Sequence, residues 1–294
     1  MTDRHSARNW FSRRIDSQTA GEDAAGSAGG TDRRAADWDR PTCFGNGSAR
    51  TADSGWSTVT PLHYTPSYEY PLIVWLHQSG HNERQVHQVL PHISIRNYLA
   101  VGVRGPRAVD LAGHGFDWPT GSGGFDAACG RVFAAIDEVC RQYSVHQRRI
   151  VLAGYRSGAS MACRIALRHP QRFAGVVRLG GEFPDGGGCL SALEQLRHAR
   201  LPMLWQQAIN GRDDHPGRLQ RDLVTAQLIR ARVEVRQYRG DDVMNTVALR
   251  DIDRWCFERI ISPRQDPSAA PESGILGDGE LNAHDTTPLE FSRN

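Results

Sequence analysis

Between residues 69 and 261, short apolar runs alternate with longer amphipathic segments. This alternation is typical of strand–helix–strand units, in which a mostly parallel sheet is covered by helices on both faces. The sequence therefore predicts an α/β fold. The apolar runs predict six strands, at residues 72–76, 98–103, 150–153, 173–179, 201–205 and 233–238.

Five amphipathic segments between or after these strands predict helices, at residues 84–92, 124–143, 157–169, 217–231 and 246–261. In the second segment, apolar residues recur at spacings of three and four, which places them on one face of a helix. These residues are Phe125, Ala128, Val132, Ala135, Ile136 and Val139.

The two ends of the chain differ in composition from the segment between them. Residues 1–68 and 262–294 are rich in small, polar and charged residues and sustain no strand or helix period, so we expect both to be disordered. They also account for the low hydrophobic share of 39% and the mean hydropathy of −0.50. One domain, at residues 69–261, then carries the fold.

The overall charge is nearly balanced. The cations are 35 arginines, with no lysine, and against 33 acidic residues they leave a net charge of +2, which argues against a nucleic-acid binder. No apolar stretch reaches the length of about 18 residues that a membrane span needs. The N-terminus lacks the apolar core of a signal peptide, so we expect a cytoplasmic protein.

The six cysteines form no C-x-x-C pair and have no closely spaced histidine partner. Their spacing is typical of isolated reduced thiols and not of a zinc site or a disulfide framework. The glycine-rich strings at 121–124 and 186–188 lack the sequence context of a phosphate-binding loop. We therefore expect no metal and no cofactor. The oligomeric state stays open.

The segment 148–181 carries the most specific motif. An apolar strand runs into a tight turn with Gly154 and Gly158, and an amphipathic segment follows directly. In a strand–turn–helix elbow, the residues two before and two after the centre must be small so that strand and helix can approach. The central residue here is Arg156.

These motifs resemble the α/β-hydrolases, most closely the phospholipase/carboxylesterase and polyhydroxybutyrate-depolymerase-like esterases. The resemblance rests on the elbow at 153–158, on RHPQRFAGVV at 168–177, on PLIVWLHQSGHNERQ at 71–85 and on the last strand, turn and helix from 233 to 260. It covers nearly all of residues 69–261. It implies the three-layer α/β-hydrolase fold and ester hydrolysis by a serine, an acid and a histidine.

Two triad positions depart from that pattern. Arg156 stands at the position of the nucleophilic serine, and its guanidinium stays protonated, so it cannot attack an ester. The histidine position falls on Asp242, or on Asp241 or Val243 if the turn slides by one residue. Near neutral pH a carboxylate cannot take a proton from serine as imidazole does. The only histidine beyond His215 is His284, in the C-terminal tail.

The third triad position keeps its residue type. Asp214, with Asp213 beside it, matches the acid of the family. In a triad this acid orients the histidine. Without a histidine, Asp214 could equally be an ordinary loop carboxylate.

Two neighbouring serines are alternative nucleophiles. Ser157 follows Arg156, and Ser160 lies in a small-x-Ser-x-small string. Tyr155 fills the small position before Ser157, and the string around Ser160 lies inside the predicted helix. The competing interpretation is a helix-cap residue and a helix-packing residue.

Two further segments resemble parts of the family's pocket. His77, Gln78, Ser79 and Gly80 match the loop that contributes a backbone N–H to the oxyanion hole, although Gln78 replaces a glycine. His77 is either a structural residue of this loop or a base. Trp118, in a loop before a long helix, either lines the pocket or packs in the core.

The departures at 156 and 242 are complementary in charge. Arg156 and Asp242 could form an ion pair that closes the site, or Arg156 and the oxyanion amides could bind a small anion. We therefore predict a non-catalytic α/β-hydrolase-fold protein that binds a small molecule or anion or a partner. The alternatives are a serine ester hydrolase using Ser157 or Ser160, and an enzyme of another class on the same scaffold.

Overall fold

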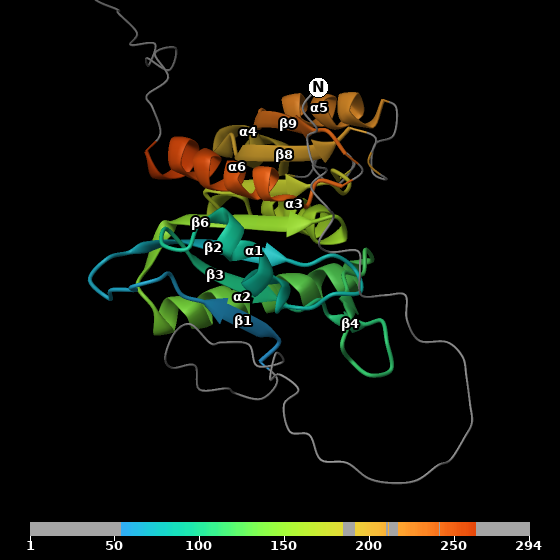
Figure 1. Cartoon of the computed structure of the whole chain (residues 1–294). Helices are drawn as coiled ribbons and strands as arrows, with labels where there is room; N and C mark the ends of the chain where they lie inside the picture. Colours follow the sequence, from blue (N-terminus) through green and yellow to red (C-terminus); the bar gives the residue numbers. More distant parts are fainter. Residues whose placement is uncertain (1–53, 185–191, 210, 212–216, 241, 263–294) are drawn as a thin grey trace, which may run out of the picture. The chain divides into compact units, whose positions relative to one another are not determined.

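The structure is a computed structural model that describes residues 54–184, 192–209, 211, 217–240 and 242–262. A seven-stranded sheet forms its centre (Figure 1). All neighbouring strands pair in parallel except the first, which pairs antiparallel at one edge. The strand order is β1 (Trp56–Val59), β3 (Leu99–Val103), β2 (Tyr70–Leu76), β6 (Val145–Tyr155), β7 (Gly175–Leu179), β8 (Pro202–Ala208) and β9 (Arg232–Tyr238).

Helices cover both faces of this sheet, which gives the three layers that the sequence predicted (Figure 1). One face carries α1 (Gln85–Ile93) and α6 (Thr246–Cys256), which continues as a π-helical turn at Phe257–Ile261. The other face carries α2 (Ser122–Gln142), α3 (Ser157–Arg168), α4 (Leu193–Ala199) and α5 (Arg218–Leu228). Among the described helices, none is long and apolar enough to cross a membrane.

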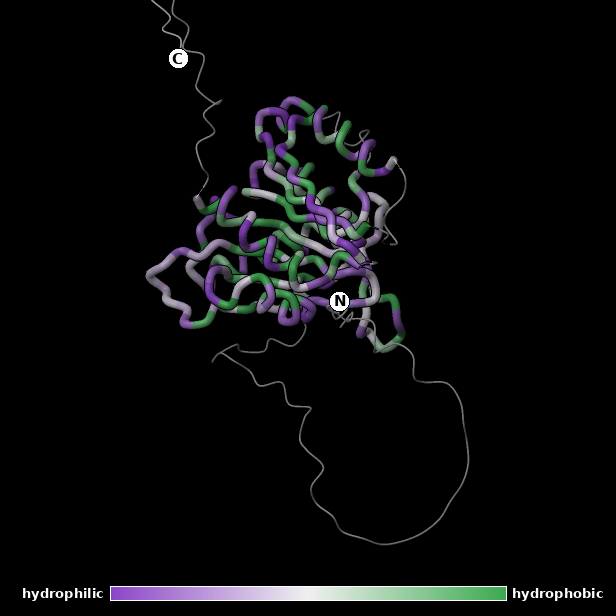
Figure 2. The backbone as a smooth tube through the Cα atoms, turned by 45° about the horizontal axis from the view of Figure 1, so that its top comes forward, coloured by the Kyte–Doolittle hydropathy of each residue, from purple (hydrophilic) through white to green (hydrophobic). Residues whose placement is uncertain are grey.

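The central strands are buried on both faces, which explains why their sequences are continuous apolar runs. In β2, Leu72, Val74 and Leu76 pack in the cluster under α2 and α3, whereas Ile73 and Trp75 pack in the cluster under α1 and α6. Figure 2 shows the hydrophobic residues gathered along these strands, while the surrounding helices alternate between hydrophobic and hydrophilic residues. Two apolar layers therefore hold the sheet.

Part of the N-terminal segment that the sequence predicts to be disordered belongs to the sheet. The sequence pattern placed residues 1–68 outside the fold, but β1 at Trp56–Val59 pairs with β3 and extends the sheet at its edge. This strand is only four residues long and half-buried, so it lacks the apolar run of a central strand. Residues 1–53 and 263–294 lie outside the described residues.

Three short elements were also missed, α4 and the two-residue strands β4 (Arg107–Ala108) and β5 (Phe116–Asp117). They are too short to show a period in sequence. The strands β4 and β5 pair with each other after β3 and shape the loop that supports the site.

Candidate functional site

The elbow lies where β6 ends and α3 begins. Arg156 has φ 48° and ψ −114°, a left-handed conformation that side-chain-bearing residues rarely adopt and that costs energy. Its N–H donates to the carbonyl of Leu179 over 2.9 Å, and its own carbonyl accepts from the N–H of Ser160 over 3.0 Å. The end of β7 and the first turn of α3 thus hold the strained residue in place.

The glycines of the elbow meet the small-residue requirement predicted for it. A Cβ on Gly154 would lie 2.6 Å from the carbonyl carbon of Gly158, and one on Gly158 would lie 2.2 Å from the carbonyl oxygen of Leu76. Both distances are far shorter than any real contact of a Cβ. The first turn of α3 is therefore pressed against the ends of β6 and β2.

The side chain of Arg156 forms the ion pair predicted from the sequence. Its Nη2 lies 3.3 Å from Oδ2 of Asp242, and its guanidinium carbon lies 5.3 Å from the ring centre of Tyr155. Asp242 also accepts from the Tyr155 hydroxyl over 2.6 Å and from the N–H of Met244 over 3.0 Å. The side chains of Arg156 and Asp242 are 28% and 16% exposed. Three donors therefore hold the Asp242 carboxylate in place.

Of the other residues considered for the histidine and acid positions, the structure describes only Val243. Val243 packs in the hydrophobic cluster under α6, so the turn has not slid to place it in the site. Asp213, Asp214, Asp241, His215 and His284 lie outside the described residues.

Both alternative nucleophiles accept a hydrogen bond from a backbone amide. The N–H of Ser79 donates to Oγ of Ser157 over 2.7 Å, and the N–H of Glu182 donates to Oγ of Ser160 over 2.7 Å. Ser160 also hydrogen-bonds to the carbonyl of Arg156 over 3.4 Å. In the described part of the chain, neither serine hydroxyl has a hydrogen bond to a histidine. Each hydroxyl is thus anchored to a backbone amide near the start of α3.

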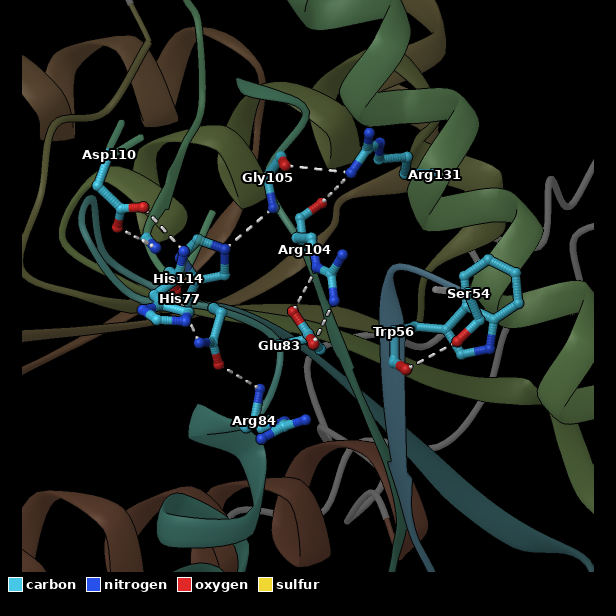
Figure 3. A network of polar contacts seen from close by, with 12 residues as sticks. Ser54, Trp56, His77, Glu83, Arg84, Arg104, Gly105, Asp110, His114 and Arg131 are labelled. Carbon is cyan, nitrogen blue, oxygen red and sulfur yellow. Dashed lines mark hydrogen bonds and ion pairs between the residues drawn. The ribbon is translucent and has the colours of Figure 1, made fainter. Parts of the chain in front are cut away.

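His77 is a structural residue of its loop. The N–H of Gly105 donates to its Nε2 over 3.0 Å, so the proton lies on Nδ1, which donates to the carbonyl of Gln78 over 2.7 Å (Figure 3). Burial lowers the pKa of His77 to about 4, because a desolvated ring favours its neutral form. Both ring nitrogens are occupied, so His77 is not placed to act as a base on either serine.

Trp118 packs in the hydrophobic core beneath the same loop. Its side chain is almost fully buried, and its indole N–H donates to the carbonyl of His77 over 2.7 Å. Gly80 takes a left-handed φ of 81°, and its N–H donates to the carbonyl of Phe116 over 3.0 Å. The side-chain amide of Gln78 contacts His81. The 77–80 loop therefore turns as the resemblance implied, although Gln78 replaces a glycine.

A buried ion pair behind this loop was not found from the sequence. Nε and Nη2 of Arg104 each lie 2.8 Å from a carboxylate oxygen of Glu83 (Figure 3). Burial would raise the pKa of Glu83, but the hydrogen bonds and charge of Arg104 outweigh it and lower that pKa. Arg131 donates to the carbonyl of Gly105 over 3.2 Å. The network ties the loop after β2 to the loop after β3.

A second ion pair, between β7 and α5, was also missed. Arg178, in β7, is fully buried, and its Nη1 lies 2.6 Å from Oδ2 of Asp222 in α5. Its guanidinium carbon lies 4.3 Å from the ring centre of Trp205. Its Nε and Nη2 have no hydrogen-bond partner among the described residues. The only signal in the sequence was an arginine within a predicted buried strand.

A pocket of about 260 Å³ lies beside the elbow, next to the segment that Ser160 holds. Arg156 is not among its lining residues, so this cavity does not serve the anion site predicted around Arg156. Within the described ranges, no group of three His, Cys, Asp or Glu side chains could hold a metal ion. The pocket is lined by Glu182, Phe183, Pro184, Arg218, Arg221, Asp222 and Thr225.

The sheet order, the helices on both faces and the strained elbow between β6 and α3 define an α/β-hydrolase fold. No family model and no curated protein matches the sequence. Solved structures match the fold. SOBER1 from Arabidopsis thaliana is 18% identical, with a TM-score of 0.54, over 65% of this chain and 99% of that one.

A carboxylesterase from Bacillus cereus is 15% identical over 69% of this chain and 93% of that one, with a TM-score of 0.54. The esterase PE8 is 16% identical over 69% of this chain and 98% of that one, with a TM-score of 0.53. At these identities the likeness concerns the fold, and the chemistry must be argued from the side chains of this chain.

Proposed function

We propose that this chain is a non-catalytic α/β-hydrolase-fold protein whose former reaction site is closed by its own side chains. One observation carries the proposal: the apex of the elbow presents Arg156, and its guanidinium lies 3.3 Å from Asp242. The cation and the carboxylate occupy the positions where an ester hydrolase needs a nucleophile and a base. Binding of a small molecule, an anion or a partner is the remaining role.

The magnitudes favour this proposal over residual catalysis. Removing the serine or the histidine of a triad costs about 10⁶ in turnover, and only about 10³ to 10⁴ over water remains from the oxyanion hole and binding. Here both positions carry residues that cannot do the chemistry. Asp242 is moreover held by Tyr155, Arg156 and Met244, so its oxygens are occupied.

The alternative, an ester hydrolase that uses Ser157 or Ser160, gains no support from the geometry. A serine nucleophile needs a base within hydrogen-bond distance of its hydroxyl. Each of these hydroxyls instead accepts a backbone N–H, and the nearby His77 uses both of its ring nitrogens in its own loop.

The direct test compares hydrolysis of p-nitrophenyl acetate and butyrate by the wild type, Ser157→Ala and Ser160→Ala. We expect all three to match the protein-free rate within about twofold, since the described residues place no base beside either serine. A fluorophosphonate probe should leave the wild type unlabelled. Turnover well above background that vanishes in one serine variant would overturn the proposal, and labelling of either serine would do the same.

A further inference from the structure

The two backbone amides of an oxyanion hole can be located in this chain. In an α/β-hydrolase elbow, one donor is the N–H of the residue after the apex, and the other comes from the loop after an early strand. If position 156 is the apex, as the proposed function assumes, the first donor is the N–H of Ser157. The second is the N–H of Ser79, because this amide points at the start of α3.

The acceptor of the Ser79 amide is the hydroxyl oxygen of Ser157, at 2.7 Å. Donors of an oxyanion hole lie about 2.7 to 3.1 Å from the oxygen that they stabilise. We propose that the Ser157 hydroxyl occupies the oxyanion position of this site, as an internal substitute for the oxygen of an ester intermediate. The site is then closed twice, by Arg156 with Asp242 and by Ser157 with Ser79.

The surroundings of Ser79 keep its amide aimed at Ser157. Two nearby residues of the loop are held, since His77 is buried and bonded to Gly105 and Trp118, and the N–H of Gly80 donates to the carbonyl of Phe116. On the other side, the close approach of Gly158 to the end of β2 fixes the first turn of α3. The amide and the hydroxyl are thus brought together by two rigid segments.

Ser160 offers a matched control. It lies one turn further along α3, and its hydroxyl also accepts a backbone N–H over 2.7 Å, but from Glu182 on the opposite side of the elbow. Removing either hydroxyl deletes one oxygen and a 2.7 Å hydrogen bond from a backbone amide. The Ser160 variant also loses the longer hydrogen bond to the carbonyl of Arg156, at 3.4 Å. Only the removal of Ser157 should free the amide of Ser79.

The first measurement is amide hydrogen exchange by NMR. Ser157→Ala should accelerate exchange of the Ser79 amide about tenfold and leave the Glu182 amide unchanged, since one hydrogen bond is lost. Ser160→Ala should do the reverse. Unchanged exchange at Ser79 in Ser157→Ala overturns the inference.

The second measurement separates oxyanion stabilisation from simple access to the site. Arg156→Cys places a thiol at the apex, and thiols react without a dedicated base. Acylation by p-nitrophenyl acetate passes through an oxyanion, whereas alkylation by iodoacetamide does not. Both rates are read at position 156 by peptide mass spectrometry, so that the native cysteines do not interfere.

Adding Ser157→Ala to Arg156→Cys should raise the ratio of acylation to alkylation at least tenfold, because an oxyanion donor is worth about 10² to 10³ in rate. Adding Ser160→Ala should leave the ratio unchanged. An equal ratio in all three proteins overturns the inference. A thiol at 156 that reacts with neither reagent instead contradicts the apex position assumed by the proposed function, and exchange at Ser79 then decides the contact by itself.

Discussion

Two arginine–carboxylate pairs lie on neighbouring strands and differ in burial. Arg156, after β6, and Asp242, after β9, have side chains 28% and 16% exposed, whereas Arg178 in β7 and Asp222 in α5 have side chains 0% and 11% exposed. Solvent screens the first pair, so its contribution to stability is small. In the second pair, either partner alone would be a buried charge. The first pair therefore bears mainly on function and the second on folding.

The hydrogen-bond partners in the two ion pairs also differ. Arg178 has one carboxylate and the face of Trp205, and two of its nitrogens have no hydrogen-bond partner within the described residues. Such a cation depends strongly on its partner. Asp242, in contrast, has two further donors in Tyr155 and Met244, so its position does not depend on Arg156 alone.

The largest expected effect comes from breaking the buried pair. Asp222→Ala leaves the charge of Arg178 without compensation and should lower the free energy of unfolding by about 3 to 5 kcal/mol, measured by urea denaturation. The double variant Arg178→Met with Asp222→Leu should recover most of this loss, since apolar side chains can replace a buried pair. A loss below about 1 kcal/mol in Asp222→Ala would remove the contrast between the pairs.

A somewhat smaller effect on stability is expected from His77, in the 77–80 loop, which belongs to neither ion pair. Because the pKa of His77 is lowered to about 4 in the fold, its neutral form stabilises the protein fully above about pH 6.5, and this stability is lost as the pH falls towards 4. The full loss is about 3 kcal/mol for a lowering from 6.5.

Urea unfolding between pH 7 and pH 4 measures this loss. The acid-induced loss should shrink in His77→Asn, which keeps a polar side chain in the loop, and should persist in Arg156→Gln. An equal pH dependence in the wild type and His77→Asn would contradict the assignment of His77 as a buried neutral residue.

The smallest effect is expected at the elbow pair. Arg156→Gln should change the free energy of unfolding by about 1 kcal/mol or less, and 1 M salt should remove part of that difference. Asp222→Ala should keep its effect in salt, because the buried pair is screened much less. A loss at Arg156 as large as at Asp222 would mean that the elbow pair supports the fold.

The parts of this molecule that sequence could predict are those encoded locally. The buried strands are continuous apolar runs, and the elbow is marked by two glycines within five residues, Gly154 and Gly158, although the close approach of Gly158 is to the distant Leu76. The pair of Arg156 with Asp242 was also predicted, since the family pattern places both residues and their charges are complementary.

The missed features depend on contacts between distant segments. The hydrogen bond from Ser79 to Ser157 joins residues 78 apart, and the pair of Arg178 with Asp222 joins residues 44 apart. No local sequence pattern encodes which backbone amide donates to a serine hydroxyl, or which carboxylate pairs with an arginine in a strand. The strand β1 was missed for another reason, since an edge strand of four half-buried residues has no distinctive period.

The strained conformation at position 156 has a consequence for engineering. The chain keeps φ at 48° with an arginine there, because the close packing of Gly154 and Gly158 and the hydrogen bond to the end of β7 hold the turn. These contacts involve the backbone and not the Arg156 side chain. The backbone at position 156 is therefore a rigid attachment point, at which a reporter group or a designed ligand could be displayed without redesign of the scaffold.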